Sequence, residues 1–249
     1  MMQALLTSLY LLLPVLFGGI FVHYLKQSNK DQFIKLALAF SGGFLLAIAC
    51  LHLLPDLYSA EDAGLGIGMY ILFGFLVQLI LEFFSGGIEH GHVHVHKGQA
   101  MPWGLFLSLS VHSIIEGIPL GNQIAGLHAE VGGHHHGTDD TLLFGIIFHQ
   151  FPVAVALMTL LLQTSIKQSS SWIYLLLFGI MTPLGLLVGL YMPAAQIGAD
   201  YHMILAIVVG MFLHISTTII FETAENHTFH LFKLLAILSG CFLAFLVIP

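Results

Sequence analysis

A chain of 249 residues that is 57% hydrophobic and only 8% charged is not a water-soluble domain, because soluble domains carry about 25% charged residues. Its formal net charge of −7, with six lysines and no arginine, leaves no basic patch for binding nucleic acid. Both cysteines fall inside apolar segments, so the composition predicts neither a disulfide framework nor a cluster of metal-binding thiolates.

Apolar runs of about 20 residues follow one another along the chain, and each is long enough to cross a bilayer as a helix. We predict an all-α polytopic membrane protein with eight spans, at residues 4–25, 33–54, 67–86, 103–124, 141–163, 172–193, 203–221 and 230–248. The first run continues as a span, so we expect no cleaved signal peptide. No shift in composition marks a second domain. Residues 1–249 are therefore predicted to form a single transmembrane domain, with a histidine-containing loop at about 87–101.

The charged residues predict how the chain threads the membrane. All six lysines fall on one side of the eight predicted spans, whereas the loops on the other side carry carboxylates and no lysine. The positive-inside rule assigns the lysine side to the cytosol. Both termini are then expected on the non-cytosolic side, where the acidic loops would raise the local concentration of cations.

The fourth predicted span contains HSIIEGIPLG, residues 112–121, in which ionisable side chains lie in the middle of an apolar run. Glu116 is costly at that depth, and a carboxylate there marks a functional site with an expected partner. His112 lies four residues earlier, on the same face of a helix. Pro119 leaves the carbonyl of Ile115 without its helical donor, which is tolerated where backbone lines a site.

Small residues accompany these polar ones in the fourth span. Ser113, Gly117 and Gly121 recur every four residues and form a stripe against which another helix can pack closely. We expect that helix to be the fifth span.

The fifth predicted span has a similar arrangement in FHQFPVAV, residues 148–155. His149 and Gln150 lie in mid-span, and Pro152 frees the carbonyl of Phe148. Two imidazoles and a carboxylate at matching depth suit a divalent transition metal, zinc above all. A hydrogen bond to a neighbouring helix is the alternative for any one of these histidines alone. Together they predict a metal site with three ligands: His112, Glu116 and His149.

Polar residues elsewhere are candidates for the path of an ion. His52 and Asp56 flank a proline near the outer end of the second span, where they are either an entrance site or an interfacial helix end. His214 and Glu222, in and after the seventh span, predict an exit path; a hydrogen bond between helices and a solvated loop are the alternatives.

The predicted cytosolic loop contains the run HGHVHVHKG, residues 90–98. Four histidines that alternate with other residues in a flexible chain would bind metal weakly and without fixed geometry. We expect them to sense or buffer cytosolic metal, or to contribute little: His90, His92, His94 and His96.

Three segments together resemble the ZIP (Zrt/Irt-like) family of divalent metal-ion transporters: FSGGFLLAIACLHLLPD at 40–56, HSIIEGIPLG at 112–121 and the HQFPVAV of the fifth span. The resemblance covers essentially the whole chain. It implies eight spans with outward termini, transport of zinc toward the cytosol, and metal ligands at His112, Glu116 and His149. Iron, manganese and cadmium are further substrates that it allows.

The chain also departs from the pattern of several family members. Those members carry carboxylates where this chain has Gln150 and Val153, and a further polar ligand where it has Ser113. A second, bridged metal is therefore not expected, and the pattern is closer to that of members with a single transport site. Gln150 and Ser113 are expected to orient the ligands instead.

Weak internal similarity favours an inverted repeat. SGGFLLAI at 41–48 and VVGMFLHI at 208–215 open the second and seventh spans, which run in opposite directions in the predicted topology. This is the pattern of a 3+2+3 arrangement, in which spans 1–3 and 6–8 are related around a central pair and the substrate lies near the midplane. The family fold has the same plan.

Two other functions compete with transport. An intramembrane zinc-dependent hydrolase would use the same ligands, although the sequence has neither a His-Glu-x-x-His helix nor a serine nucleophile elbow. A haem-binding electron carrier would use His112 and His149 as axial ligands, but no arginine is present to hold the propionates. The expected partners are a divalent metal ion and the lipid bilayer, with a homodimer as an open alternative.

Overall fold

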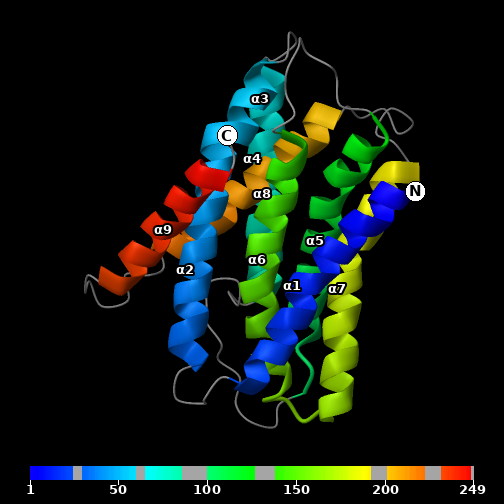
Figure 1. Cartoon of the computed structure of the whole chain (residues 1–249), viewed down its shortest axis with the longest axis vertical. Helices are drawn as coiled ribbons and strands as arrows, with labels where there is room; N and C mark the ends of the chain where they lie inside the picture. Colours follow the sequence, from blue (N-terminus) through cyan, green and yellow to red (C-terminus); the bar gives the residue numbers. More distant parts are fainter. Residues whose placement is uncertain are drawn as a thin grey trace.

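The computed structural model describes residues 1–24, 30–59, 65–85, 100–126, 138–191, 201–221 and 231–247, and these residues form a bundle of helices without a strand (Figure 1). The helices are α1 (Met2–Tyr24), α2 (Lys30–Ile48), α3 (Leu54–Ser59), α4 (Leu65–Ser85), α5 (Trp103–Ile124), α6 (Thr138–Leu161), α7 (Gln168–Tyr191), α8 (Tyr201–Phe221) and α9 (Leu231–Val247). A π-helical segment, Ala49–Leu53, joins α2 to α3 and is called the π-turn below.

The prediction of an all-α chain with several membrane spans is confirmed. Seven of the described helical segments are long and apolar enough to cross a membrane, and α9, with 17 residues, is a shorter apolar helix. The start of α1 and the end of α9 lie toward the same end of the bundle (Figure 1), as an even number of crossings requires. Which side of the membrane that end faces stays a prediction.

The second span is longer than the sequence predicts. It runs without interruption from Asp31 to Ser59, because the chain passes Pro55 in helical form. Proline cannot donate a backbone hydrogen bond and clashes with the preceding turn. The wider π-turn just before Pro55 accommodates this irregularity, and π-turns of this kind occur often at functional sites.

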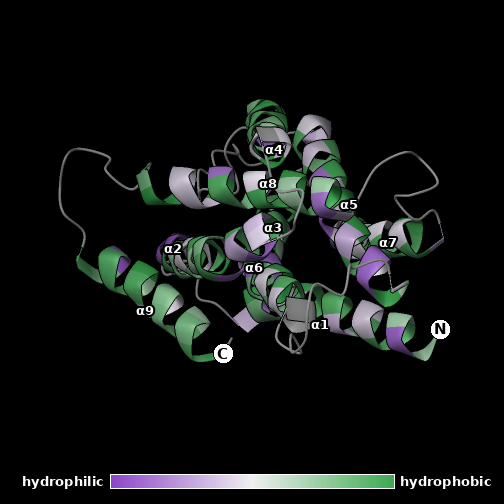
Figure 2. Ribbon diagram, turned by 90° about the horizontal axis from the view of Figure 1, so that it is seen from above, coloured by the Kyte–Doolittle hydropathy of each residue, from purple (hydrophilic) through white to green (hydrophobic). Residues whose placement is uncertain are grey.

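Apolar side chains cover the outer surface of the bundle. Viewed from above, hydrophobic residues cover much of α4 and α9 at the periphery (Figure 2). Large apolar side chains are exposed on several helices, including Phe17, Phe73, Ile180 and Phe245. Exposed apolar surface on this scale marks a membrane-facing protein. By contrast, α6 lies in the middle of the bundle, and most of its described side chains are buried.

The helices pack most extensively as four pairs: α5 with α7, α2 with α9, α4 with α8, and α1 with α6. In a 3+2+3 arrangement, spans 1, 2 and 3 (α1, α2 and α4) would be related to spans 6, 7 and 8 (α7, α8 and α9), and the central helices α5 and α6 to each other. The pair α1·α6 would then map onto α7·α5. The pair α2·α9 would likewise map onto α8·α4. The pairing is compatible with the 3+2+3 arrangement, which itself stays a prediction.

Glycines allow close backbone contact in the α5·α7 pair. A Cβ atom on Gly117 would lie 2.2 Å from the carbonyl oxygen of Thr182, and one on Gly185 would lie 2.0 Å from that of Ile114. No side chain fits at either position. The glycine stripe of the fourth span therefore admits α7, the sixth span, and the expectation that it admits the fifth span is wrong. The reason is that α7 carries a matching stripe of glycines, whereas α6 does not.

Candidate metal site

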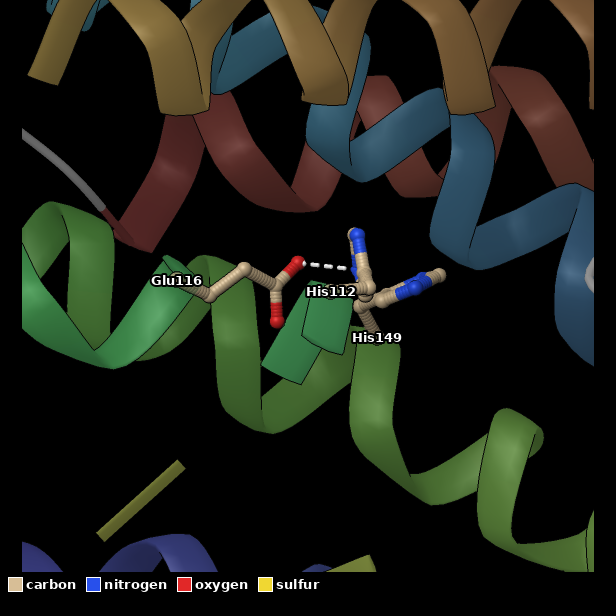
Figure 3. A group of neighbouring side chains, drawn as sticks. All are labelled: His112, Glu116 and His149. Atoms are coloured by element: carbon tan, nitrogen blue, oxygen red, sulfur yellow. Dashed lines mark ion pairs between the residues drawn. The ribbon is translucent and has the colours of Figure 1, made fainter. Parts of the chain in front are cut away.

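The three predicted ligands converge in the interior of the bundle. His112 and Glu116 project from α5, and His149 projects from α6 toward them (Figure 3). One ligand atom from each lies within 4.8 Å of the other two, and all three side chains are at most 3% exposed. Among the residues that the structure describes, this is the one group of three or more metal-ligand side chains.

Helix geometry explains the contact within α5. One turn separates His112 from Glu116, and the Nε2 atom of His112 lies 2.6 Å from Oε1 of Glu116. The imidazole of His149 meets that of His112 edge to face, with ring centroids 5.9 Å apart. A tetrahedral zinc ion with bonds of about 2.0–2.1 Å holds its ligand atoms about 3.4 Å apart. An ion would therefore widen the 2.6 Å contact between His112 and Glu116 by about 0.8 Å.

The charge of Glu116 has little compensation from the protein. The residue is 0% exposed, and its Oε2 atom has no hydrogen-bond partner within the described ranges. A buried carboxylate without donors is costly, and a bound cation removes that cost. The site is thus built to hold positive charge, as a metal ion or as a proton on His112.

Each histidine is held by a side chain from another helix. The Nδ1 atom of His112 lies 2.8 Å from Oε1 of Gln78 on α4, and the Nδ1 atom of His149 lies 3.2 Å from the hydroxyl of Ser41 on α2. Both partners are 0% exposed. Contacts of this kind fix the orientation of a ligating imidazole.

Gln150 and Ser113, the two residues expected to orient the ligands, are both buried. The amide of Gln150 donates a hydrogen bond to the hydroxyl of Thr182 on α7, which links the ligand-bearing α6 to that helix. Ser113 is buried on α5 directly after His112.

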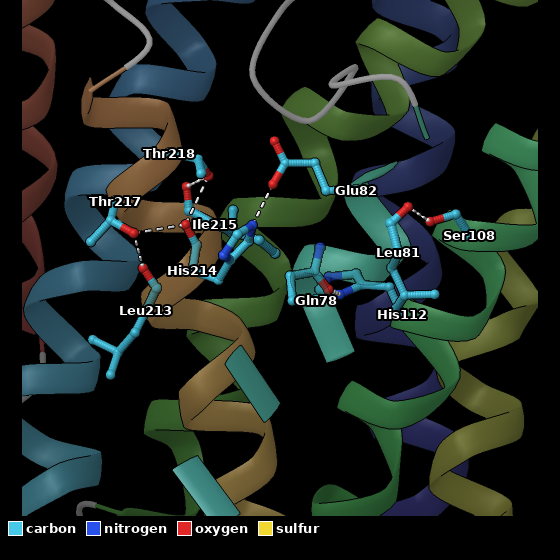
Figure 4. Close-up of polar contacts among 10 residues, drawn as sticks. All are labelled: Gln78, Leu81, Glu82, Ser108, His112, Leu213, His214, Ile215, Thr217 and Thr218. Atoms are coloured by element: carbon cyan, nitrogen blue, oxygen red, sulfur yellow. Dashed lines mark hydrogen bonds and ion pairs between the residues drawn. The ribbon is translucent and has the colours of Figure 1, made fainter. Parts of the chain in front are cut away.

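A second polar cluster lies beside the first (Figure 4). His214 of α8 is 2% exposed and forms an ion pair with Glu82 of α4 through its Nε2 atom. The ring of Phe75 packs edge-on against His214 at 4.7 Å. Glu82 lies one helical turn after Gln78, so a single face of α4 contacts both His112 and His214.

The predicted entrance residues are not members of the metal-ligand group. His52 is in the π-turn and Asp56 is in the first turn of α3, and both are partly exposed. Neither belongs to a group of three metal-ligand side chains in the described part of the chain. Glu222 and the loop histidines His90, His92, His94 and His96 lie outside the described residues.

Reasoning from the sequence missed Gln78, Glu82 and Ser41. The signal was present for two of them, because Gln78 and Glu82 are polar residues four apart in an otherwise apolar run. Ser41 gave no comparable signal, because serine is common in membrane helices as a small packing residue.

Comparison with known proteins adds an independent observation. The profile of the family described as ZIP Zinc transporter matches residues 87–248. Zinc transporter ZIP1 of Homo sapiens is 24% identical over 263 residues, which cover 86% of this chain and 78% of that protein. Zinc transporter ZIP1 of Bos taurus is 25% identical over 238 residues, covering 76% of this chain and 70% of that protein. Zinc transporter ZIP1 of Danio rerio is 29% identical over 161 residues, covering 63% of this chain and 50% of that protein.

Proposed function

Because the chain belongs to the ZIP family of zinc transporters, we propose that it carries a divalent metal ion, zinc first, across the membrane toward the cytosol. The ion would bind at a single site near the midplane, between α5 and α6, with His112, Glu116 and His149 as ligands. The observation that carries this proposal is the convergence of three buried ligand atoms within 4.8 Å of one another.

The donor set supports zinc as the substrate. Two imidazole nitrogens and one carboxylate oxygen suit a borderline-soft ion such as zinc, and iron, manganese or cadmium would follow according to geometry and supply. Calcium and magnesium prefer shells made of oxygen atoms. We therefore expect zinc uptake to resist a large excess of either ion.

Two features support one ion at a time. Val153 has no ligand atom, and Gln150 is neutral and donates to Thr182. Without further carboxylates, the site lacks the negative charge that a second divalent cation would require.

The alternatives have less support. Members of this family are transporters and not enzymes, so the hydrolase has no observation in its favour. A haem iron would need an open nitrogen on His112, whereas its Nε2 atom lies 2.6 Å from Oε1 of Glu116 and its Nδ1 atom lies 2.8 Å from Oε1 of Gln78. A homodimer stays a prediction.

The test is zinc flux into liposomes that contain a zinc-sensitive dye. Wild type is compared with His112→Ala, Glu116→Gln and His149→Ala, and with Ser108→Ala as a matched control. Ser108 lies on α5 one turn before His112, and its hydroxyl donates to the carbonyl of Leu81 without contacting a ligand. We expect the three ligand variants to abolish flux and the control to retain it. Flux that survives loss of Glu116 would contradict the proposed site.

Direction needs a separate measurement in cells that express the protein. A cytosolic zinc probe should brighten when zinc is added outside, and Glu116→Gln should prevent the rise. A fall in the cytosolic signal would show export.

A further inference from the structure

The helices divide into two bundles by the contacts they share. One, the ligand bundle, contains α1, α5, α6 and α7, which are joined by the contacts α5·α7, α1·α6 and α1·α7. The other, the support bundle, contains α2, α4, α8 and α9, joined by α2·α9, α4·α8 and α2·α8. The bundles meet mainly where α2 packs on α6 and where α4 packs on α5.

All three proposed ligands belong to the ligand bundle, whereas both residues that hold the histidines belong to the support bundle. Gln78 contacts His112 across the α4·α5 contact, at 2.8 Å. Ser41 contacts His149 across the α2·α6 contact, at 3.2 Å. Each ligating imidazole is thus oriented by a hydrogen bond that crosses the boundary between the bundles.

The chemistry of the partners determines which nitrogen can bind metal. An amide oxygen only accepts hydrogen bonds, so the Nδ1 atom of His112 carries a proton and donates it to Gln78. A metal ion would then bind at Nε2, the nitrogen that faces Glu116; without an ion, the 2.6 Å contact between Nε2 and Oε1 of Glu116 requires a proton between these two atoms. The hydroxyl of Ser41 can accept the Nδ1 proton of His149 in the same way, leaving Nε2 of that ring as the ligating atom.

We propose that Gln78 and Ser41 are positioning residues that make metal affinity depend on how the two bundles are arranged. The proposal rests on the proposed transport function and goes beyond it. In the present arrangement both imidazoles are held in an orientation that brings a nitrogen atom of each within 4.8 Å of the other ligand atoms. When one bundle moves relative to the other during transport, both hydrogen bonds break, the imidazoles lose their fixed orientation, and the ion is released.

Removal of either contact has an expected size. Loss of a residue that orients a metal ligand typically weakens binding about 10- to 100-fold. Gln78→Leu and Ser41→Ala should each weaken metal binding within that range. Gln78→Glu keeps an acceptor oxygen and should restore affinity toward that of wild type.

The first measurement is equilibrium binding of Co²⁺, an absorbing substitute for zinc, to the purified full chain in detergent. The Kd and the visible spectrum report the affinity and the coordination geometry. Ser108→Ala is the matched control, because its hydrogen bond crosses the same α4·α5 contact without contacting a ligand. We expect weaker binding and an altered spectrum for Gln78→Leu and Ser41→Ala in the folded protein, and a metal-free Tm for each below that of the control, because a buried imidazole loses its hydrogen-bond partner. Should Gln78→Leu prove unstable, Ser41→Ala, which removes one oxygen atom, carries the test alone.

The second measurement is zinc flux as a function of concentration in liposomes. If a variant binds zinc more weakly in the arrangement that takes up the ion, and releases it unhindered, its KM rises and its Vmax stays equal to or above that of wild type. General damage to the fold lowers Vmax instead.

The results separate two failures. If wild type neither binds Co²⁺ nor transports zinc, the proposed function and this inference both fail. If wild type does both, and Gln78→Leu and Ser41→Ala bind Co²⁺ within about twofold of the Ser108→Ala control, the inference alone is wrong. A Gln78→Glu variant as defective as Gln78→Leu would also overturn it.

Discussion

Gly185→Ala tests whether the close α5·α7 contact positions the metal site. The new methyl carbon would lie 2.0 Å from the carbonyl oxygen of Ile114, whereas ordinary contact begins at 3.4 Å. The two helices must therefore separate by about 1.4 Å at this point, which is the difference between these two distances. Ile114 lies between His112 and Glu116, so the ligands are next to the strain.

The displacement affects the site whichever helix moves. If α5 moves, two ligands shift relative to His149 by far more than the tolerance of about 0.2 Å in metal-ligand distances. If α7 moves, the hydrogen bond between Gln150 and Thr182 is strained, because Thr182 lies one turn before Gly185. We expect overpacking to lower the free energy of unfolding by about 1–3 kcal/mol. Zinc affinity should fall at least about tenfold.

The assay combines thermal unfolding in detergent with Co²⁺ titration, and Gly66→Ala is the control. A Cβ atom at Gly66 meets nothing within 4 Å, so that variant should be neutral or slightly more stable, because alanine favours helices. A Gly185→Ala variant that matched Gly66→Ala in both Tm and affinity would contradict the prediction, since α5 and α7 would then have absorbed the methyl group without cost.

Three further predictions concern the second polar cluster, the pH dependence and the histidine loop. Glu82→Gln and His214→Leu should each lower the free energy of unfolding by about 1–3 kcal/mol, because each leaves a buried polar partner without its ion pair; a double variant whose loss equals the sum of the two single losses would show that the pair is not coupled. Zinc uptake should fall as the external pH drops from about 7.5 to about 5.5, since protons compete with the metal for imidazole nitrogens; a rate unchanged down to about pH 5 would count against histidine ligation. Replacing the loop histidines His90, His92, His94 and His96 with alanine should leave the initial rate of flux in liposomes unchanged, and a loss as large as that of Glu116→Gln would place the loop in the transport path.

The helices could be predicted from the sequence because membrane spans depend on local composition. Runs of about 20 apolar residues need no partner to be recognised, and the bounds of the predicted spans differ from the observed helices by a few residues. The larger difference is in the second span, which was predicted at residues 33–54 and runs from Asp31 to Ser59. The π-turn lets the helix continue past Pro55. It depends on the packing of neighbouring helices and has no recognisable pattern in the amino-acid sequence.

The candidate site was predictable where its contacts depend on residues that are close together in the sequence. His112 and Glu116 are four residues apart on one helix, so their contact follows from helix geometry alone. Bringing His149 to them required only matching depth in the membrane. The partner of the glycine stripe was predicted wrongly because the choice between α6 and α7 depends on how the helices are ordered around the bundle. Gln78 and Ser41 were missed for a related reason, since a buried amide or hydroxyl gains its role from the side chain it meets.

The π-turn gives the second span two helical registers. Each residue of an α-helix advances about 100° around the axis, and a π-turn holds one residue more than the regular ladder allows. The segment Leu54–Ser59 is therefore rotated by about one residue relative to the face that Lys30–Ile48 presents. A helical wheel drawn from α2 would assign the wrong neighbours to Asp56. Deleting a single residue from the π-turn would restore one continuous wheel and turn Asp56 by about a quarter of a revolution. One residue of chain length thus sets the direction in which the end of this span faces. The carboxylate of Asp56 can be turned toward other neighbours without replacing any side chain.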